Sequence, residues 1–165
     1  MTTPQVDRDV IPPLVKSVLV SLSVEDAFRL FTEGYARWWP LLSHSVGEEH
    51  AQTCVLEAGI GGRIYEIIDD GRQVEWGRVL AWEPPRRLVF SWYPGRQPDT
   101  AQQVEVTFRV QGVHTLVQLT HTGWENLGAL AQAHRLNYDS GWDTVLGKYT
   151  GVANAAGSFS SLPGD

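Results

Sequence analysis

Histidines, glutamates and tryptophans gather in one short segment, RWWPLLSHSVGEEH, which runs from Arg37 to His50. A zinc or other transition-metal site needs three or four ligands held in fixed geometry. His44 and His50 are separated by the flexible stretch SVGEE, and no His-x-x-x-His pair or zinc-type cysteine motif accompanies them. We therefore expect a solvated loop here and no metal ion.

The two tryptophans of this segment are adjacent. Neighbouring side chains on a helical turn point in different directions, so two adjacent indoles cannot both point inward. We expect one to anchor the core and the other, Trp39, to lie at a surface or a cavity opening. Structural anchoring of both rings is the alternative.

Two further histidines lie in patterned segments. His121 ends a predicted strand and shares a face with apolar residues, so we expect it to look into a cavity. His134, Tyr138 and Trp142 are spaced by four and form one stripe of a helix. An imidazole is a suitable general base near neutral pH. A histidine on an apolar stripe is more often a core residue, and we assign no catalytic residue.

Alternation along two strands adds aromatic candidates for a cavity. Phe90 and Trp92 share a face of RLVFSWY, and Phe108 lies on the apolar face of VEVTFRV. The glycines of GIGG do not connect a strand to a helix, so they predict no phosphate-binding loop. No Gly-x-Ser-x-Gly elbow occurs. We expect no cofactor.

Helices and strands must hold these residues in place, and the N-terminal part of the chain predicts the first of them. Residues 14–22 are β-rich and lead into Ser23, which two acids follow in the next turn. A serine cap before acidic residues is typical of a helix start. We predict a helix from Val24 to about Phe31, ended by Gly34, and one short turn in YARWW.

The rest of the chain predicts strands and then one long helix. Six β-rich segments from residue 53 to 121 are separated by turn residues, which predicts an antiparallel meander of about seven strands with the first one. From about Asn126 to Thr150 apolar residues recur every three or four positions, which is typical of one face of a helix. The stripe consists of Leu130, His134, Tyr138, Trp142, Val145 and Tyr149. We predict an α+β domain whose curved sheet wraps around a C-terminal helix.

Composition limits the possible classes. The chain has 165 residues, which suits one domain, and 19 acids against 13 bases give a net charge of -6. This balance argues against nucleic-acid binding. A single cysteine, Cys54, and the lack of an apolar run of about 18 residues predict a cytoplasmic protein without a membrane span. We expect a mobile leader at 1–13, one domain at 14–151 and a flexible tail at 152–165.

Several motifs in this order resemble the helix-grip (START-like, Bet v 1-like) superfamily, in the branch similar to the C-terminal domain of the activator of heat-shock-protein-90 ATPase. The motifs are VEDAF, RWWP, GGRIYE, WGRVLAWEPPRRLVFSW, QLTHTGW and GWDTVLGKY. The resemblance implies a helix-grip fold with a cavity between sheet and helix for apolar ligands. It also implies that Ile64 and Glu66 point into the grip, where the buried carboxylate needs a partner such as Arg78.

We therefore expect a cavity that binds a small apolar or amphipathic molecule, rather than an enzyme. The candidate lining residues are Trp39, Glu66, Phe90, Trp92, Phe108, His121, His134, Tyr138 and Trp142. The resemblance leaves two alternatives: a cyclase- or dehydratase-like enzyme that uses a cavity histidine, and a chaperone-ATPase activator. A homodimer is a further expectation for the chain.

Overall fold

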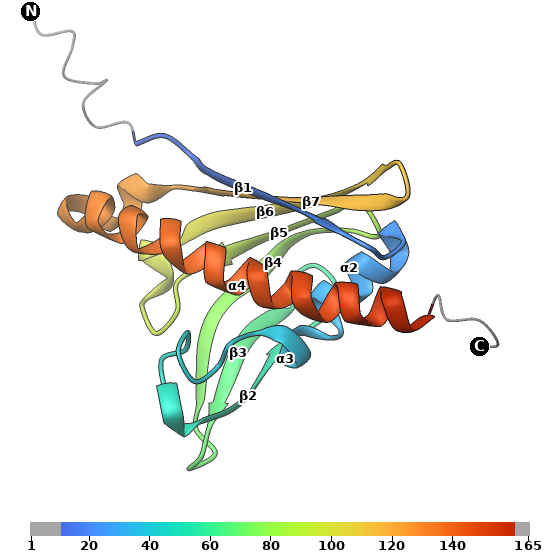
Figure 1. Cartoon of the computed structure of the whole chain (residues 1–165). Helices are drawn as coiled ribbons and strands as arrows, with labels where there is room; N and C mark the ends of the chain where they lie inside the picture. The colour runs from blue at the N-terminus through green and yellow to red at the C-terminus, as the bar shows by residue number, and fades with distance from the viewer. Residues whose placement is uncertain (1–10, 161–165) are drawn as a thin grey trace, which may run out of the picture.

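The computed structural model describes the backbone of residues 11–160 and the side chains of residues 11–156. Within this range a seven-stranded antiparallel sheet curls around a long C-terminal helix (Figure 1), which confirms the predicted α+β helix-grip fold. In chain order the strands and α-helices are β1 (Leu14–Val20), α2 (Val24–Thr32), α3 (Tyr35–Trp38), β2 (Ala51–Leu56), β3 (Arg63–Ile68), β4 (Gln73–Glu83), β5 (Arg87–Trp92), β6 (Gln102–Gln111), β7 (His114–Thr122) and α4 (Ala131–Ser160). Three 3-10 turns, η1 (Glu48–His50), η2 (Pro98–Thr100) and η3 (Trp124–Leu130), connect them.

The strand order is β1-β7-β6-β5-β4-β3-β2. Strands β2 to β7 form the predicted meander, each paired with the next. The expectation that β1 would lie beside β2 is wrong, because α2 and α3 carry the chain away from β1. β1 instead pairs with β7, and Leu14 lies opposite His121.

The sheet changes course within β4. This strand pairs with β3 through Gln73–Arg78 and with β5 through Val79–Glu83. A Cβ atom at Gly77 would lie 1.8 Å from the carbonyl oxygen of Ser91 on β5, so glycine is required for this close approach. The bend brings the Trp76 and Trp92 side chains to the same concave side, where their rings are 5.8 Å apart.

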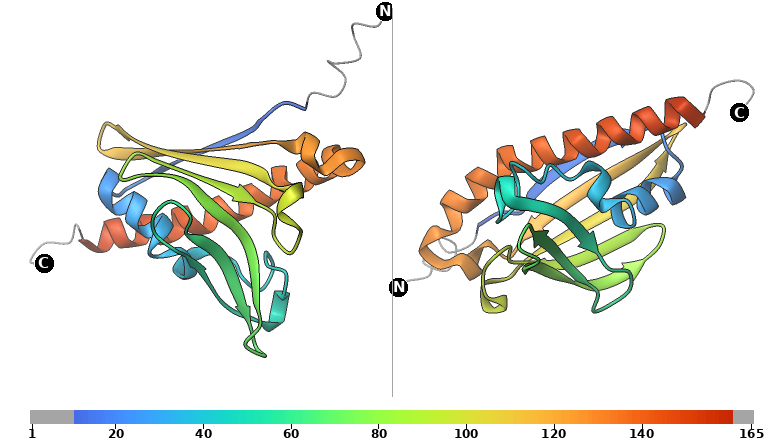
Figure 2. Two further views of the ribbon diagram at one scale, coloured as in Figure 1. Left: turned by 180° about the vertical axis from the view of Figure 1, so that it is seen from behind. Right: turned by 90° about the horizontal axis from the view of Figure 1, so that it is seen from below.

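Helix α2 begins as the sequence predicts. The Ser23 hydroxyl accepts a hydrogen bond from the backbone N–H of Asp26 at 3.1 Å, which satisfies one of the free donors at the helix start. Its apolar side packs into the sheet, with the Phe28 ring 5.2 Å from the Phe108 ring. Figure 2 shows α4 running the length of the curled sheet, with α2 and α3 beside its C-terminal half.

The long helix differs from the prediction at both ends. It begins at Ala131 rather than near Asn126, because Gly128 (φ 61°, ψ -129°) interrupts the helical backbone, and Leu130 is exposed. The helix continues to Ser160 with Ala153 fully buried, so residues 152–160 of the predicted tail are helical. The side chain of Asn154 accepts a hydrogen bond from the backbone N–H of Ser21, which ties this end to the domain.

The predicted leader and the last tail residues lie largely outside the described residues, which exclude 1–10 and 161–165. At 12 and 13 the chain is held in place, since Arg135 on α4 donates hydrogen bonds to the carbonyl oxygens of Pro12 and Pro13. Across residues 11–160, none of the helices combines the length and the apolar character needed to cross a membrane.

Candidate functional site

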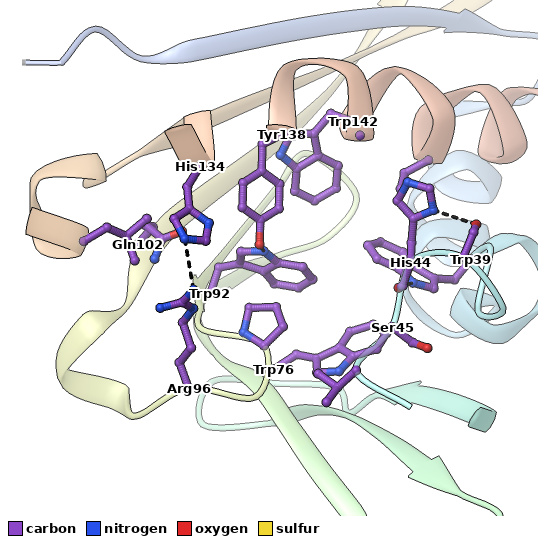
Figure 3. Close-up of a pocket in the computed structure, with 16 residues that line it drawn as sticks. Trp39, His44, Ser45, Trp76, Trp92, Arg96, Gln102, His134, Tyr138 and Trp142 are labelled. Atoms are coloured by element: carbon purple, nitrogen blue, oxygen red, sulfur yellow. Dashed lines mark hydrogen bonds between the residues drawn. The ribbon is translucent and has the colours of Figure 1, made fainter. Parts of the chain in front are cut away.

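A pocket of about 340 Å³ lies between the sheet and α4 (Figure 3). Four tryptophans from different elements form its wall: Trp39 after α3, Trp76 on β4, Trp92 on β5 and Trp142 on α4. The other lining residues are Ser43, His44, Ser45, Val46, Pro94, Arg96, Gln102, Leu127, His134, Tyr138, Gly141 and Val145. The volume is in the range of small-molecule sites.

Each indole N–H of this wall is already bonded within the protein. The acceptors are the His44 carbonyl oxygen for Trp39 (2.7 Å), Glu66 Oε1 for Trp76 (2.6 Å), the Tyr138 hydroxyl for Trp92 (3.0 Å) and His121 Nδ1 for Trp142 (3.0 Å). The contacting ring centroids are 5.2 to 6.1 Å apart. The hydrogen bonds fix the rings, so the wall offers apolar ring surface and no free indole donor.

Glu66 supports this wall from behind. Its carboxylate is fully buried, as expected, and accepts hydrogen bonds from the backbone N–H groups of Val46 (2.7 Å) and Gly47 (2.8 Å) as well as from Trp76. The expectation that Arg78 would be its partner is wrong. Arg78 lies opposite Arg63 in the β3–β4 register, on the other face of the sheet from Glu66, and bonds to Glu75.

His121 also lies behind the wall and does not line the pocket. Its ring is fully buried and stacks on Trp124 at 3.9 Å, and burial lowers the pKa of His121 to about 3. Because Nδ1 accepts from Trp142, the proton is on Nε2, which donates to Gln102 Oε1 at 3.2 Å. His121 is therefore a neutral residue that orients two lining side chains.

His134 is at the pocket mouth, where Arg96 Nη2 donates to its Nε2 at 2.9 Å (Figure 3). Burial, together with the Arg96 charge, lowers the pKa of His134. The imidazole is therefore neutral at pH 7, with its proton on Nδ1. The basic nitrogen of His134 thus already has a donor.

Tyr138 contributes a donor to the pocket. Its oxygen accepts from Trp92, and no residue in the described part of the chain accepts a hydrogen bond from its hydroxyl proton. Burial raises the pKa of Tyr138, so the proton is retained at neutral pH. Tyr138 can therefore donate one hydrogen bond to a bound molecule.

Two predicted candidates belong to the core rather than the pocket. Phe90 lies behind Trp92, with ring centroids 5.6 Å apart. Phe108 lies under α2, in contact with Phe28 and Phe31. Of the nine predicted lining residues, the structure brings together Trp39, Trp92, His134, Tyr138 and Trp142.

The adjacent tryptophans are both buried, with exposed fractions of 3% for Trp38 and 7% for Trp39. The expectation that they could not both point inward is wrong, because the helix ends between them. Trp39 has extended backbone angles (φ -64°, ψ 128°), which turn its side chain toward the pocket, while Trp38 donates to the Leu30 carbonyl oxygen in the core.

Sequence reasoning missed several lining residues, above all Trp76, His44 and Arg96. Trp76 was predictable in principle, because the residues of β4 before Gly77 pair with the part of β3 that contains Glu66, a predicted lining residue. His44 was expected in a solvated loop, but it lines the pocket, and its ring is bonded to the Ser43 hydroxyl at 2.7 Å. Among the described residues, no three His, Cys, Asp or Glu side chains form a group that could hold a metal ion.

Comparison with protein families gives one match over most of the chain. The family described as Activator of Hsp90 ATPase homolog 1-like protein matches residues 21–150, which include α2, the four pocket tryptophans and most of α4. A comparison with curated proteins found no match.

Solved structures include two relatives of higher sequence identity. An anthrahydroquino-gamma-pyrone synthase solved in complex with SUM is 32% identical, covering 87% of this chain and 98% of that chain, with a TM-score of 0.60. CalC from Micromonospora echinospora, a self-sacrificing resistance protein, is 28% identical, covering 88% and 96%, with a TM-score of 0.63. The Aha1 dimer from Colwellia psychrerythraea is 16% identical, covering 87% and 97%, with a TM-score of 0.62, and this likeness concerns the fold alone.

Proposed function

The chain belongs to the Activator of Hsp90 ATPase homolog 1-like family, and on that premise we propose that it binds a small, planar, largely apolar molecule in the tryptophan-lined pocket. One observation carries the proposal: all four indole N–H groups are bonded inside the protein, so the wall presents ring faces and apolar edges. Flat aromatic molecules match such surfaces by stacking. The similarity to a synthase named for a fused aromatic product supports the same ligand class.

The pocket size sets the expected affinity. A flat molecule of two or three rings that buries roughly 300 Å² of apolar surface gains about 7 kcal/mol at 25 cal/mol per Å². Association and ordering costs reduce this gain. A gain of about 7 kcal/mol corresponds to a dissociation constant near 10 µM before these costs, so we expect values between about 10 µM and 1 mM for a simple aromatic probe. The natural ligand, which also uses the polar groups at the mouth, should bind more tightly.

The proposal is tested with N-phenyl-1-naphthylamine, an uncharged aromatic probe whose fluorescence rises on burial. Trp39→Ala removes one wall of the pocket and should weaken probe binding about tenfold or more. Trp82→Ala is the matched control, because Trp82 is a half-buried tryptophan of β4 that does not line the pocket. A folded Trp39→Ala protein that keeps the affinity of the unmodified chain would overturn the proposal.

A second candidate is a cyclase- or dehydratase-like enzyme, and the position of Tyr138 favours it. The Tyr138 hydroxyl keeps a free proton in the pocket, where it can polarise a ligand carbonyl. Such a reaction also needs a general base, and neither His134 nor His121 presents a free basic nitrogen to the pocket. His134 Nε2 is occupied by Arg96, and His121 is buried behind Trp142.

The two candidates differ in what His134→Ala does. A binding protein should keep most of its affinity for the molecule that co-purifies with it from its own cells. An enzyme should lose turnover while remaining folded, and the co-purified molecule should change from product to precursor. Native mass spectrometry of both proteins distinguishes these outcomes.

A further inference from the structure

Among the described arginines, Arg96 is the one that lines the pocket. It lies in the loop between β5 and β6 and directs Nη2 at His134. Within the described part of the chain it forms no ion pair with a carboxylate, whereas Arg63, Arg78 and Arg87 do. No carboxylate therefore offsets the guanidinium at the pocket mouth, and several of its N–H donors are free.

The other pocket residues do not offset this charge. None of the sixteen lining residues is acidic, although the whole chain has a net charge of -6. The nearest buried carboxylate described above, Glu66, lies behind Trp76 and already accepts three hydrogen bonds. The mouth is therefore a local positive site next to an apolar wall.

His134 and Tyr138 complete the geometry. His134 Nε2 accepts from Arg96 and so holds the guanidinium over the mouth as a neutral positioning residue. Tyr138 has a hydroxyl proton without an acceptor among the described residues. Figure 3 places Arg96, His134 and Gln102 together on one side of the tryptophans, with His44 on the other side. A molecule that stacks on the wall thus meets the positive charge of Arg96 at one end of the pocket.

We propose that the natural ligand carries an anionic oxygen group, such as a carboxylate or phenolate, that is bound by Arg96 with help from the Tyr138 hydroxyl. This inference rests on the proposed function, since the apolar body of the ligand lies on the tryptophan wall. Charge-assisted hydrogen bonds to a planar guanidinium are strong and directional. They select the orientation of a flat ligand that stacking alone leaves undefined.

Two probes with the same ring system test the charge. 8-Anilinonaphthalene-1-sulfonate and N-phenyl-1-naphthylamine differ by one sulfonate, which stands for the anionic oxygen group. Arg96→Gln should weaken binding of the sulfonate about tenfold and change binding of the neutral probe less than twofold. Arg96→Lys should retain part of the sulfonate affinity, and Tyr138→Phe should reduce it about threefold.

Arg86→Gln is the control for net charge, because Arg86 lies in the turn between β4 and β5 and does not line the pocket. It should leave both affinities unchanged. Equal loss of both probes in Arg96→Gln, or no loss of the sulfonate, overturns the anionic-group inference while the proposed function stands. Failure of the unmodified chain to bind either probe overturns the proposed function and this inference with it.

Discussion

Two aromatic clusters lie side by side inside the curled sheet, and they hold their rings by different interactions. The phenylalanine cluster consists of Phe28, Phe31, Phe108 and Tyr149, whose contacting rings meet edge to face with centroids 5.2 to 5.8 Å apart. The tryptophan cluster consists of Trp39, Trp76, Trp92 and Trp142. Each of its rings is bonded through its N–H to a partner outside the cluster.

The difference explains why only one cluster encloses a pocket. Rings held by packing alone, as the three phenylalanines are, move together until the space between them is filled, as in ordinary protein cores. Rings bonded to partners at their edges cannot move inward without breaking those bonds, so a cavity remains open. The polar residues behind the tryptophans, Glu66 and His121, are thus as important to the pocket as the residues that line it.

The largest effect on stability should come from the phenylalanine cluster. Phe108→Ala removes a ring that contacts Phe28 and Phe31 and leaves a cavity in a closed core. We expect a loss of about 3–5 kcal/mol in the free energy of unfolding. Urea unfolding measures it. Probe affinity of the folded variant should stay the same, and a tenfold loss of affinity would show that the two clusters are not independent.

Glu66→Gln should cause the next largest loss of stability, because Glu66 holds part of the tryptophan cluster in place by hydrogen bonds. A glutamine has only one acceptor oxygen, so it cannot serve Val46, Gly47 and Trp76 together, and its NH2 group faces a donor. We expect a loss of about 2–3 kcal/mol and weaker probe binding, because Val46 and Trp76 line the pocket.

Glu105→Gln is the control for this carboxylate. Glu105 pairs with Arg87 in a partly exposed position, where solvent screening leaves an ion pair little effect on stability. Urea unfolding of both variants gives the comparison. If Glu66→Gln costs no more than Glu105→Gln, the carboxylate does not hold the wall.

Acid should act on the tryptophan cluster through His121. Its pKa is about 3 in the folded protein and near the ordinary 6.5 in the unfolded chain. Between these pH values the unfolded chain binds more protons than the folded protein does. The contribution of neutral His121 to the free energy of unfolding is therefore complete above pH 6.5 and is lost as the pH falls toward 3. From about pH 7 to about pH 5 the loss is about 2 kcal/mol, at 1.36 kcal/mol per pKa unit.

Urea unfolding at both pH values measures this loss. His121→Gln is the matched variant, since an amide bonds to neighbours without titrating in this range. It should be less stable at neutral pH but should lose clearly less stability on acidification. An unchanged pH dependence in His121→Gln would place the titrating group elsewhere.

The elements that carry both clusters were predictable because their patterns are local. The strand segments RIYEII and QVEWGRVLAWE begin and end as β3 and β4 do, since alternation and turn residues mark them. Trp92, Tyr138 and Trp142 were found in the same way, because the period of a strand or helix gives the direction of a side chain.

The lining residues that were not predicted lie outside the repeating patterns of strands and helices. His44 and Arg96 lie in loops, where the sequence does not indicate which way a side chain points. The partners of Glu66 are partly backbone N–H groups, which every residue but proline has, so no residue type identifies them. The cavity itself depends on how the bend at Gly77 sets β4 against α4, which is a property of the whole fold.

The smallest expected effect concerns Tyr35, which lies between the clusters, 5.1 Å from the Trp39 ring and 6.4 Å from the Phe31 ring. Its hydroxyl is fully buried and has no hydrogen-bond partner among the described residues. An unsatisfied buried hydroxyl costs free energy, so Tyr35→Phe should raise the free energy of unfolding by about 1 kcal/mol. Tyr149→Phe is the matched control with the opposite sign, since it removes a bond to the Ala27 carbonyl oxygen at 2.8 Å. If thermal and urea unfolding show that both substitutions destabilise the protein equally, Tyr35 is held by a polar partner, as the tryptophan cluster is, rather than by packing alone.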